Sequence, residues 1–323
     1  MIKSLNIQNF KSIKHLQLDC KKVNIFIGKP NTGKSNILES IGLFSLPYAK
    51  LEDLVRFDED ISNLFYDQDL GNKIAVSSEG ILFELGFQNG TFVGRGKMTA
   101  GDMIIFQFDF NFDYTGKGSI TTVGTYLFKY YKFQVVHDFA SRESFFLRPP
   151  KGDNLLSLLQ TNKALKELIK DIFSVFRLRI GFRPKERKME VVKEIGDIII
   201  SYPYSLVSDT LQRIVFHLAA IETNKDSILI FEEPEAHAFP YYTKFLAERI
   251  ALDKTNQYFI STHNPYFLLP VLAKAPKEDI SIFITYFEDY QTKVRLLTEK
   301  EMSETLDRDE SIFFNLDEFT EKE

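Results

Sequence analysis

Residues 28–35 have the types and spacing needed to hold phosphate groups. They read G-x-x-x-x-G-K-S and lie between a short apolar run, 23–27, and a helical pattern, 36–41. Glycines at both ends let the backbone wrap an anion, Lys34 can reach the β- and γ-phosphates, and the Ser35 hydroxyl can bind Mg²⁺. The pattern predicts a phosphate loop for a nucleoside triphosphate. The predicted binding residues are Gly28, Lys29, Pro30, Asn31, Thr32, Gly33, Lys34, Ser35 and Asn36.

Two carboxylates follow a second apolar run. Residues 227–231 read as a buried strand and lead directly into Glu232 and Glu233. Ligands of open α/β sheets bind beyond the carboxyl ends of the strands, so we expect this pair to meet the phosphate loop there. We assign Glu232 to Mg²⁺, through a water, and Glu233 to polarising the attacking water. Alone, such a pair more often begins a solvated loop, but the phosphate loop upstream favours the catalytic interpretation.

A third apolar run, 257–260, ends in polar residues that include His263. A histidine at a strand end is more often an ordinary surface residue than a functional one. Here it is the third in a series of strand-end motifs, after the phosphate loop and the glutamate pair. We therefore predict that His263 senses the γ-phosphate.

In this order the motifs resemble the ABC-type ATPase heads of the RecF, SMC and OLD (overcoming lysogenisation defect) group. Residues 1–13 resemble the first strand of that group, and residues 232–240 resemble the OLD-like form, whose second acidic residue is the catalytic glutamate. The resemblance is closest to a stand-alone OLD-like ATPase, because too few residues follow His263 for a Toprim nuclease domain. It implies a P-loop NTPase of the α/β class, with a mostly parallel core sheet, an antiparallel β lobe and a helical lobe.

The same resemblance gives expected boundaries. We expect residues 1–323 to form a single ABC-type ATPase domain. The nucleotide-binding core would comprise about 1–50 and 195–323, and the segment at about 51–194 would form inserted β and helical lobes.

Patterns inside the insertion agree with such lobes. Residues 81–87 and 91–93 flank a Gln-Asn-Gly turn and predict a hairpin. Phenylalanines alternate with polar residues from 106 to 112, which predicts a half-buried strand and favours sheet core over a base-stacking platform. The leucine-rich stretch from 153 to 173 predicts helices but lacks coiled-coil heptads.

In the family, a signature helix presents a serine across a dimer interface to the γ-phosphate bound by the partner. Ser208 matches that serine, and the residues after it repeat at the spacing of an amphipathic helix. Thr210 stands where the family has a glycine. We expect this difference to weaken the contact across the dimer, which bears on the rate of hydrolysis more than on ATP binding. Glu232 also stands where most such ATPases carry aspartate. No residue is assigned to the glutamine loop.

The resemblance implies ATP and Mg²⁺ as cofactors and a homodimer closed around ATP. Such a subunit would hydrolyse ATP and act on DNA or gate a separately encoded effector, such as a nuclease, in prokaryotic defence or DNA repair. An ATP-gated scaffold with little or no hydrolysis is the alternative, motivated by Thr210. A transporter subunit is disfavoured, because the chain has no L-S-G-G-Q run.

The charge of the chain leaves DNA contact open. The net charge is −5, so the surface as a whole does not indicate nucleic-acid binding. A local basic cluster could contact a phosphate backbone, but a solvated hairpin with interspersed glutamates fits equally well. The cluster comprises Arg177, Arg179, Arg183, Lys185, Arg187, Lys188 and Lys193.

Composition indicates a reducing compartment. Cys20 is the single cysteine among 323 residues, so there is no internal disulfide framework. The chain opens with a strand pattern rather than a signal peptide, and no apolar run approaches the ~20 residues needed to span a bilayer. We expect a cytoplasmic protein without membrane contact.

Overall fold

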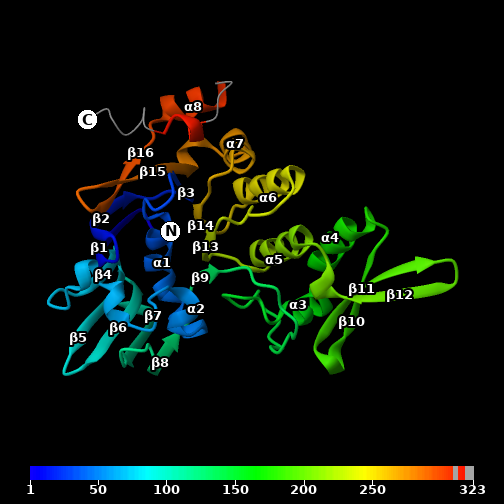
Figure 1. Cartoon of the computed structure of the whole chain (residues 1–323), viewed down its shortest axis with the longest axis horizontal. Helices are drawn as coiled ribbons and strands as arrows, with labels where there is room; N and C mark the ends of the chain where they lie inside the picture. Colours follow the sequence, from blue (N-terminus) through cyan, green and yellow to red (C-terminus); the bar gives the residue numbers. More distant parts are fainter. Residues whose placement is uncertain (308–311, 317–323) are drawn as a thin grey trace.

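A six-stranded sheet forms the centre of the molecule in this computed structural model, which describes residues 1–307 and 312–316 (Figure 1). The strand order is β16-β15-β3-β14-β13-β9, and all neighbours are parallel except the β15-β16 hairpin. The strands are β3 (Val23–Gly28), β9 (Phe128–Tyr131), β13 (Ile228–Glu232), β14 (Gln257–Ser261), β15 (Ile280–Glu288) and β16 (Gln291–Leu296).

The central strands are buried because both faces of this sheet are covered. Every residue of β3 and of β14 is buried, which explains why these segments are continuous apolar runs rather than alternating ones. The strands predicted at 23–27, 227–231 and 257–260 are confirmed as β3, β13 and β14.

One strand of this sheet comes from an unexpected part of the chain. β9 lies inside the segment 51–194, which the sequence assigned to inserted lobes, yet it pairs in parallel with β13. The segment therefore also supplies an edge strand of the nucleotide-binding sheet. All four residues of β9 are buried.

A seven-stranded antiparallel sheet packs beside the central sheet, in the order β2-β1-β4-β5-β6-β7-β8. Phe106, Phe108, Phe110 and Phe112 project from β7 into its core, where Phe106 meets Phe44. Burying each such side chain contributes about 1.5–3 kcal/mol. The predicted hairpin and half-buried strand are confirmed. The strands are β1 (Ser4–Phe10), β2 (Ile13–Asp19), β4 (Ile74–Ser78), β5 (Ile81–Gln88), β6 (Thr91–Ala100), β7 (Met103–Phe112) and β8 (Gly118–Gly124).

Helices α4, α5 and α7 begin at N-cap residues whose side chains accept a backbone hydrogen bond. The predicted helical stretch from 153 divides at Asn162, whose side chain accepts a hydrogen bond from the Leu165 amide and starts α4. The α-helices are α1 (Lys34–Gly42), α2 (Leu51–Leu54), α3 (Leu155–Thr161), α4 (Lys163–Ser174), α5 (Asp209–Thr223), α6 (Pro240–Leu252), α7 (Pro265–Lys274) and α8 (Glu299–Asp307). Across residues 1–307 and 312–316, no helix combines the length and apolarity needed to cross a membrane.

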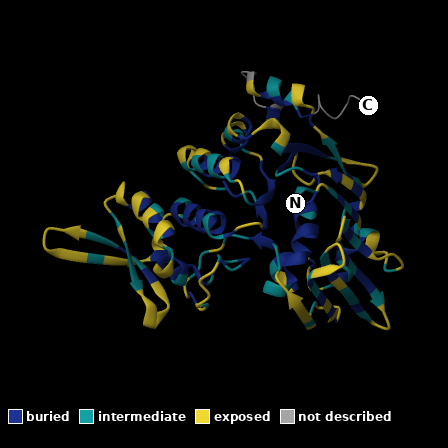
Figure 2. Ribbon diagram, turned by 180° about the vertical axis from the view of Figure 1, so that it is seen from behind, coloured by how far each residue is buried: buried dark blue, intermediate teal, exposed yellow. Residues whose placement is uncertain are grey.

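A three-stranded antiparallel sheet forms an arm that projects from the body (Figure 1). It consists of β10 (Arg179–Arg183), β11 (Lys188–Ile195) and β12 (Ile198–Pro203). The body is largely buried, whereas the outer part of the arm is exposed (Figure 2). Ile198 and Ile199 at its tip are 64% and 69% exposed. The arm joins the body through α3, α4 and α5.

Candidate active site

The phosphate loop connects β3 to α1, as the sequence predicts. Gly33 is the N-cap of α1 and has a φ of 94°, in the left-handed region that favours glycine. A Cβ built on Gly33 would lie 2.0 Å from Thr292 Oγ1, so β16 leaves no room for a larger residue. A Cβ on Gly28 would lie 2.2 Å from Thr285 Oγ1 of β15. The two glycines are thus required by packing behind the loop as well as by access to an anion.

Hydroxyl and amide side chains fix the loop from behind. Thr32 Oγ1 and Thr285 Oγ1 lie 2.6 Å apart within hydrogen-bond reach. Asn36, predicted to contact the nucleotide, donates from Nδ2 to Ser12 Oγ at 2.7 Å. Ser12 Oγ in turn lies 2.7 Å from Thr292 Oγ1. The sequence did not identify Ser12, Thr285 or Thr292, because their roles depend on contacts between distant segments.

Lys34 folds over the loop that precedes it. Its Nζ donates hydrogen bonds to the carbonyl oxygens of Gly28 and Lys29, each at 2.8 Å. Burial lowers the pKa of Lys34, and the carboxylates of Glu233 and Glu232 act in the opposite direction. The ammonium thus contacts the loop carbonyls, and the two carboxylates favour its charged form.

Ser35 and Glu232 meet, although they are far apart in the sequence. The Ser35 hydroxyl, on the first turn of α1, donates a hydrogen bond to Glu232 Oε1 at the end of β13. A hydroxyl and a carboxylate oxygen suit Mg²⁺, which keeps several waters and needs few protein ligands. The described residues contain no cluster of three or more His, Cys, Asp or Glu that could hold a metal. Ser35 and Glu232 therefore fit a water-rich magnesium site rather than an all-protein cage.

Tyr130 contacts the same carboxylate. Its hydroxyl donates to Glu232 Oε2 at 3.2 Å, and its ring packs so closely on Gly42 that a Cβ there would lie 2.2 Å from Tyr130 Cδ1. Burial, followed by the Glu232 and Glu39 carboxylates, raises the pKa of Tyr130 well above its usual value. The phenol thus stays protonated and remains a donor. The sequence did not identify Tyr130, because nothing in it places β9 beside β13.

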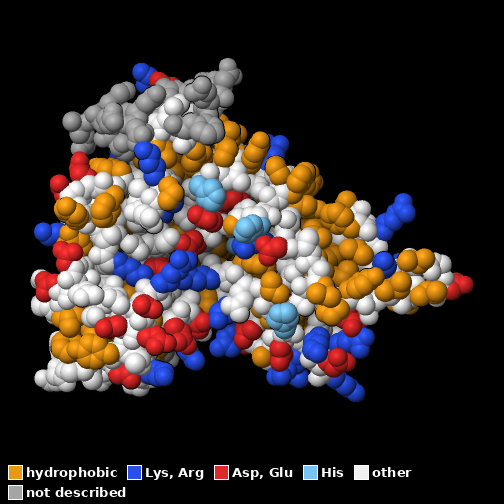
Figure 3. Space-filling model, viewed as in Figure 1, with side chains coloured by type: hydrophobic (Ala, Val, Ile, Leu, Met, Phe, Trp, Pro, Cys, Tyr) orange, Lys and Arg blue, Asp and Glu red, His pale blue; other side chains and the backbone are white. Residues whose placement is uncertain are grey.

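Basic and acidic side chains gather in the middle of this face of the molecule (Figure 3). Lys11 forms an ion pair with Glu39, whose side chain is only 2% exposed. Lys132 Nζ lies 4.8 Å from the centroid of the Tyr130 ring. Burial lowers the pKa of Lys132, while Glu39 and Glu232 oppose that shift. The surroundings of Glu232 are therefore rich in cations, which suits a phosphate-binding site.

Glu233 and His263 lie side by side at the ends of β13 and β14. His263 Nδ1 is 3.1 Å from Glu233 Oε1, and their side chains are 61% and 39% exposed. The Glu233 amide donates to Ser261 O at 3.0 Å, and Glu233 has a φ of 44°. Since β3, β14 and β13 are neighbours in the sheet, the three predicted strand-end motifs lie at adjacent strand ends. A water held by Glu233 would stay open to solvent.

Glu235 is a buried acid behind this pair. Thr262, the residue before His263, donates from Oγ1 to Glu235 Oε1. Glu235 Oε2 is buried and has no hydrogen-bond partner among the described residues. Burial raises the pKa of Glu235 to about 7, against the opposing effect of the Thr262 hydrogen bond. The third carboxylate of Glu-Glu-Pro-Glu was visible in the sequence, but its burial was not.

Ser208 lies apart from the phosphate loop of its own chain. It is the exposed N-cap of α5, and its Oγ accepts a hydrogen bond from the Leu211 amide at 3.4 Å. Thr210 Oγ1 donates to His237 O at 2.9 Å, which links α5 to the segment after Glu233. In the part of the chain that the structure describes, no hydrogen bond joins Ser208 to residues 28–36. A role for Ser208 at the phosphates would require a second chain.

Ion pairs engage three of the seven cationic side chains of the basic cluster on the arm. Arg183 pairs with Glu190 at 2.5 Å and with Glu186 at 3.4 Å. Arg179 pairs with Glu194, and Arg187 pairs with Asp138, each at 2.7 Å. Of the two interpretations that the sequence left open, these contacts favour the solvated hairpin over a dedicated DNA-contact patch.

Comparison with family models matches residues 1–173, more than half of the chain, to the family "AAA ATPase domain". The chain belongs to this AAA ATPase domain family. A second model, "AAA domain, putative AbiEii toxin, Type IV TA system", matches residues 200–269 of the AAA ATPase chain. That range holds Ser208, Glu232, Glu233 and His263.

Curated relatives match a short stretch of the AAA ATPase chain. The "DNA replication and repair protein RecF" of Lactobacillus acidophilus is 42% identical over 65 residues, covering 19% of this chain and 17% of that protein. The RecF of Caldanaerobacter subterraneus subsp. tengcongensis is 38% identical over 64 residues, covering 18% of each chain. The matches thus span less than a fifth of the length of these relatives.

Solved structures share the fold. The SMC head bound to the C-winged helix domain of ScpA has a TM-score of 0.56 at 16% identity, covering 94% of this chain and 99% of that chain. The Smc head with an extended coiled coil from Pyrococcus furiosus, bound to the C-terminal domain of ScpA, has a TM-score of 0.50 at 14% identity, covering 95% and 98%. These similarities show that this AAA ATPase chain has the fold of the SMC heads, and the family match and the short RecF matches agree with the predicted resemblance to ABC-type ATPase heads of the RecF/SMC group.

Proposed function

We propose that this chain is an ATP-binding, Mg²⁺-dependent ATP-hydrolysing subunit that dimerises around ATP. The observation that carries the proposal is the 3.1 Å contact between Glu233 and His263, beside the point where Ser35 meets Glu232. A base, a γ-phosphate sensor and a metal site are thus candidates at adjacent strand ends. The relatives and the fold support the same class of activity.

Each residue has a role in this proposal. The backbone of residues 28–35 surrounds the phosphates, and Lys34 leaves its loop carbonyls to bind the β- and γ-phosphates. Ser35, which meets Glu232, would hold Mg²⁺ directly, and Glu232 would hold it through a water. When bound, Mg²⁺ neutralises charge on the β- and γ-phosphates. Glu233 orients and polarises the attacking water, and His263 contacts the γ-phosphate.

The dimer would complete the site. Ser208 is exposed at the N-terminus of α5, where partial positive charge favours an anion, and is separate from its own phosphate loop. We therefore place Ser208 of each subunit on the γ-phosphate bound by the other. ATP would then hold the two heads together, and hydrolysis would release them.

For the biological output, we propose action on DNA or gating of a separately encoded effector, such as a nuclease, in prokaryotic defence or repair. The RecF relatives are named for DNA replication and repair, which supports a DNA-linked role. Three of the seven basic side chains in the arm's cluster, Arg179, Arg183 and Arg187, are engaged in ion pairs, which reduces the charge available to DNA and is compatible with gating of a partner. The OLD-like form of residues 232–240 motivates the nuclease.

An ATP-gated scaffold with little hydrolysis is the second candidate. Thr210 stands where the family has glycine, and its hydroxyl is engaged with His237 O at 2.9 Å. A side chain at this position limits how closely a phosphate can approach the backbone of α5. ATP binding and dimerisation without phosphate release would favour this candidate.

The Glu233→Gln variant tests the proposal. It keeps the shape of the side chain but removes the base, so phosphate release should fall by about 10²- to 10⁴-fold. The ATP-bound dimer should accumulate, as measured by size-exclusion chromatography with light scattering. Glu52→Gln is the matched control, because the Glu52 side chain is 62% exposed and lies outside the site. Unchanged turnover without a trapped dimer would show that Glu233 is not the catalytic base.

A further inference from the structure

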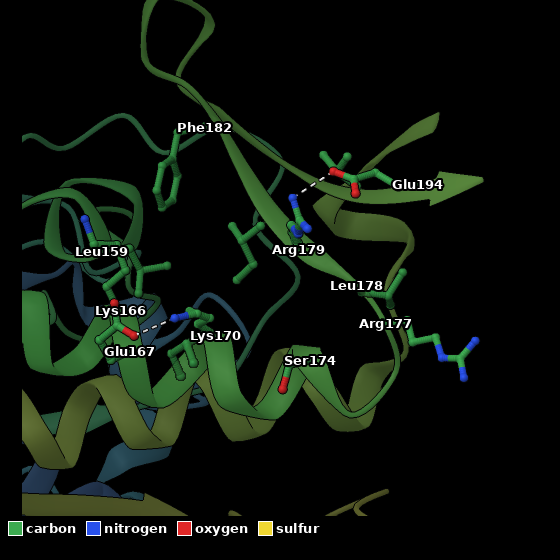
Figure 4. Close-up of a pocket in the computed structure, with 13 residues that line it drawn as sticks. Leu159, Lys166, Glu167, Lys170, Ser174, Arg177, Leu178, Arg179, Phe182 and Glu194 are labelled. Atoms are coloured by element: carbon green, nitrogen blue, oxygen red, sulfur yellow. Dashed lines mark hydrogen bonds and ion pairs between the residues drawn. The ribbon is translucent and has the colours of Figure 1, made fainter. Parts of the chain in front are cut away.

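A groove of about 540 Å³ lies between helix α4 and strand β10, outside the nucleotide site (Figure 4). Figure 4 shows Phe182 extending from the strand above the helix, with Lys166 and Lys170 on the helix side and Arg179 on the strand. Neither the family resemblance nor the proposed catalytic residues account for this groove. Its lining combines apolar side chains with an excess of cations.

The strand that borders the groove has an open edge. β10 is the first strand in the order β10-β11-β12, so only one of its edges is paired within the sheet. No other described strand pairs with its outer edge. An edge strand presents a row of main-chain N–H and C=O groups that can pair with an added strand.

The groove also has apolar positions that suit alternate side chains of an extended peptide. Ile180 and Phe182 are two residues apart on β10, so they share one face of the sheet, and both line the groove. Leu159 and Ile169, each only 1% exposed, line the helix side. Both Ile180 and Phe182 are only partly buried, which leaves apolar surface for a partner to cover.

The charges around the groove are unbalanced. Lys170 pairs with Glu167 at 2.9 Å, and Arg179 pairs with Glu194 at 2.7 Å, so both acids of the lining are already engaged. Lys166 and Arg177 also line the groove, and neither forms an ion pair with another described residue. In a chain of net charge −5, this is a local positive excess that would attract an acidic partner.

We propose that this groove binds an extended acidic segment of a partner protein, which adds as a strand to the outer edge of β10. Apolar side chains of the segment would cover Ile180 and Phe182, and its carboxylates would face Lys166 and Arg177. A second copy of β10 is disfavoured, because antiparallel self-pairing centred on Gly181 would place Arg179 opposite Arg183 of the other copy. The inference goes beyond the proposed ATPase, and it places a partner on the lobe that also carries α5.

The first experiment uses the full chain and a fluorescein-labelled peptide of about nine residues in which glutamate alternates with valine or phenylalanine. Binding is measured by fluorescence anisotropy. The control peptide replaces every glutamate with lysine. The acidic peptide should bind at least about 10-fold more tightly than the lysine peptide. A third peptide carries N-methyl groups on alternate residues along one edge, which removes its donors to β10, and it should bind about 10-fold more weakly. Equal binding of the three peptides would overturn the proposal.

The second experiment changes the groove. The double variant Lys166→Glu with Arg177→Glu should weaken binding of the acidic peptide by about 10-fold or more and leave ATP turnover unchanged. Lys163→Glu is the matched control, because Lys163 is an exposed lysine at the start of the same helix and does not line the groove. Unchanged binding in the double variant would exclude the groove. Competition by an unlabelled single-stranded oligonucleotide at a comparable concentration would assign the groove to nucleic acid and overturn the proposal.

Discussion

The Tyr130 hydroxyl donates a hydrogen bond to Glu232 Oε2 at 3.2 Å, while the Ser35 hydroxyl donates to the other oxygen of the same carboxylate. The carboxylate is thereby fixed between β9 and α1. Glu232 is one methylene longer than the usual aspartate, so its side chain has more conformational freedom. That freedom must be restrained if the carboxylate is to hold one position. Tyr130 supplies that restraint as a positioning residue.

Tyr130→Phe should therefore weaken the magnesium site while leaving the fold intact. Loss of such an outer hydrogen bond typically reduces metal affinity by 10- to 100-fold, so we expect the Mg²⁺ concentration for half-maximal turnover to rise by about 10-fold. The maximal rate at saturating Mg²⁺ should change less. The measurement is phosphate release across a Mg²⁺ titration. Tyr48→Phe is the control, because it removes a hydroxyl bonded to Tyr126 O at 2.9 Å instead. An unchanged Mg²⁺ requirement would contradict the role of Tyr130.

Glu235 should make stability depend on pH. Burial raises its pKa from 4.5 to about 7 in the folded chain. Between these values the folded chain binds a proton that the unfolded chain releases, so stability falls as pH rises from about 4.5 to about 7 and then levels off. Glu235→Gln removes this dependence. Relative to wild type, its free energy of unfolding should rise by about 3 kcal/mol between pH 4.5 and about pH 8.

Urea unfolding at the two pH values measures this difference. Glu52→Gln serves as the control. Because the Glu52 carboxylate is exposed, this variant should differ from wild type in free energy of unfolding by the same amount at both pH values. If the free energies of unfolding of Glu235→Gln and wild type differ by the same amount at both pH values, Glu235 does not titrate in this range.

Ser208 should act on the nucleotide of a second chain. A Lys34→Ala chain keeps Ser208 but lacks a working phosphate loop, and a Ser208→Arg chain has the opposite defect. Each variant alone should be inactive. In an equal mixture, half of the dimers are mixed and each contains one intact site, so turnover should recover to about a quarter of wild type. No recovery, with mixed dimers present by light scattering, would contradict the composite site.

The apolar runs made the nucleotide-binding strands predictable. β3, β13 and β14 are short and buried, and each ends in polar residues at the same edge of the sheet, so their motifs could be brought together from sequence order alone. The phenylalanine alternation of β7 was equally clear, because a strand with one buried face has a period of two. The assignment of Ser208 came from the resemblance to the family's signature segment, and the helical spacing of the residues after it predicted α5, which Ser208 caps.

The contacts that support the site were not predictable, because they join distant segments. β9 is four residues long and pairs with a strand about a hundred positions away, so local patterns could not place Tyr130. Thr292 meets Gly33 only because β16 folds back beside the loop. The buried carboxyl of Glu235 meets Thr262, just after β14, whereas its sequence context reads as another acidic loop residue.

Phosphate release from MgATP by the purified chain, beside a Lys34→Ala variant, tests the central claim most directly. Lys50→Ala is the control, because Lys50 is an exposed lysine whose side chain is 80% accessible. We predict turnover in wild type and in Lys50→Ala, and a loss of about 100-fold or more in Lys34→Ala. Equal release from all three chains would contradict the assignment of residues 28–35. Binding of ATP by wild type without release would contradict hydrolysis and favour the ATP-gated scaffold.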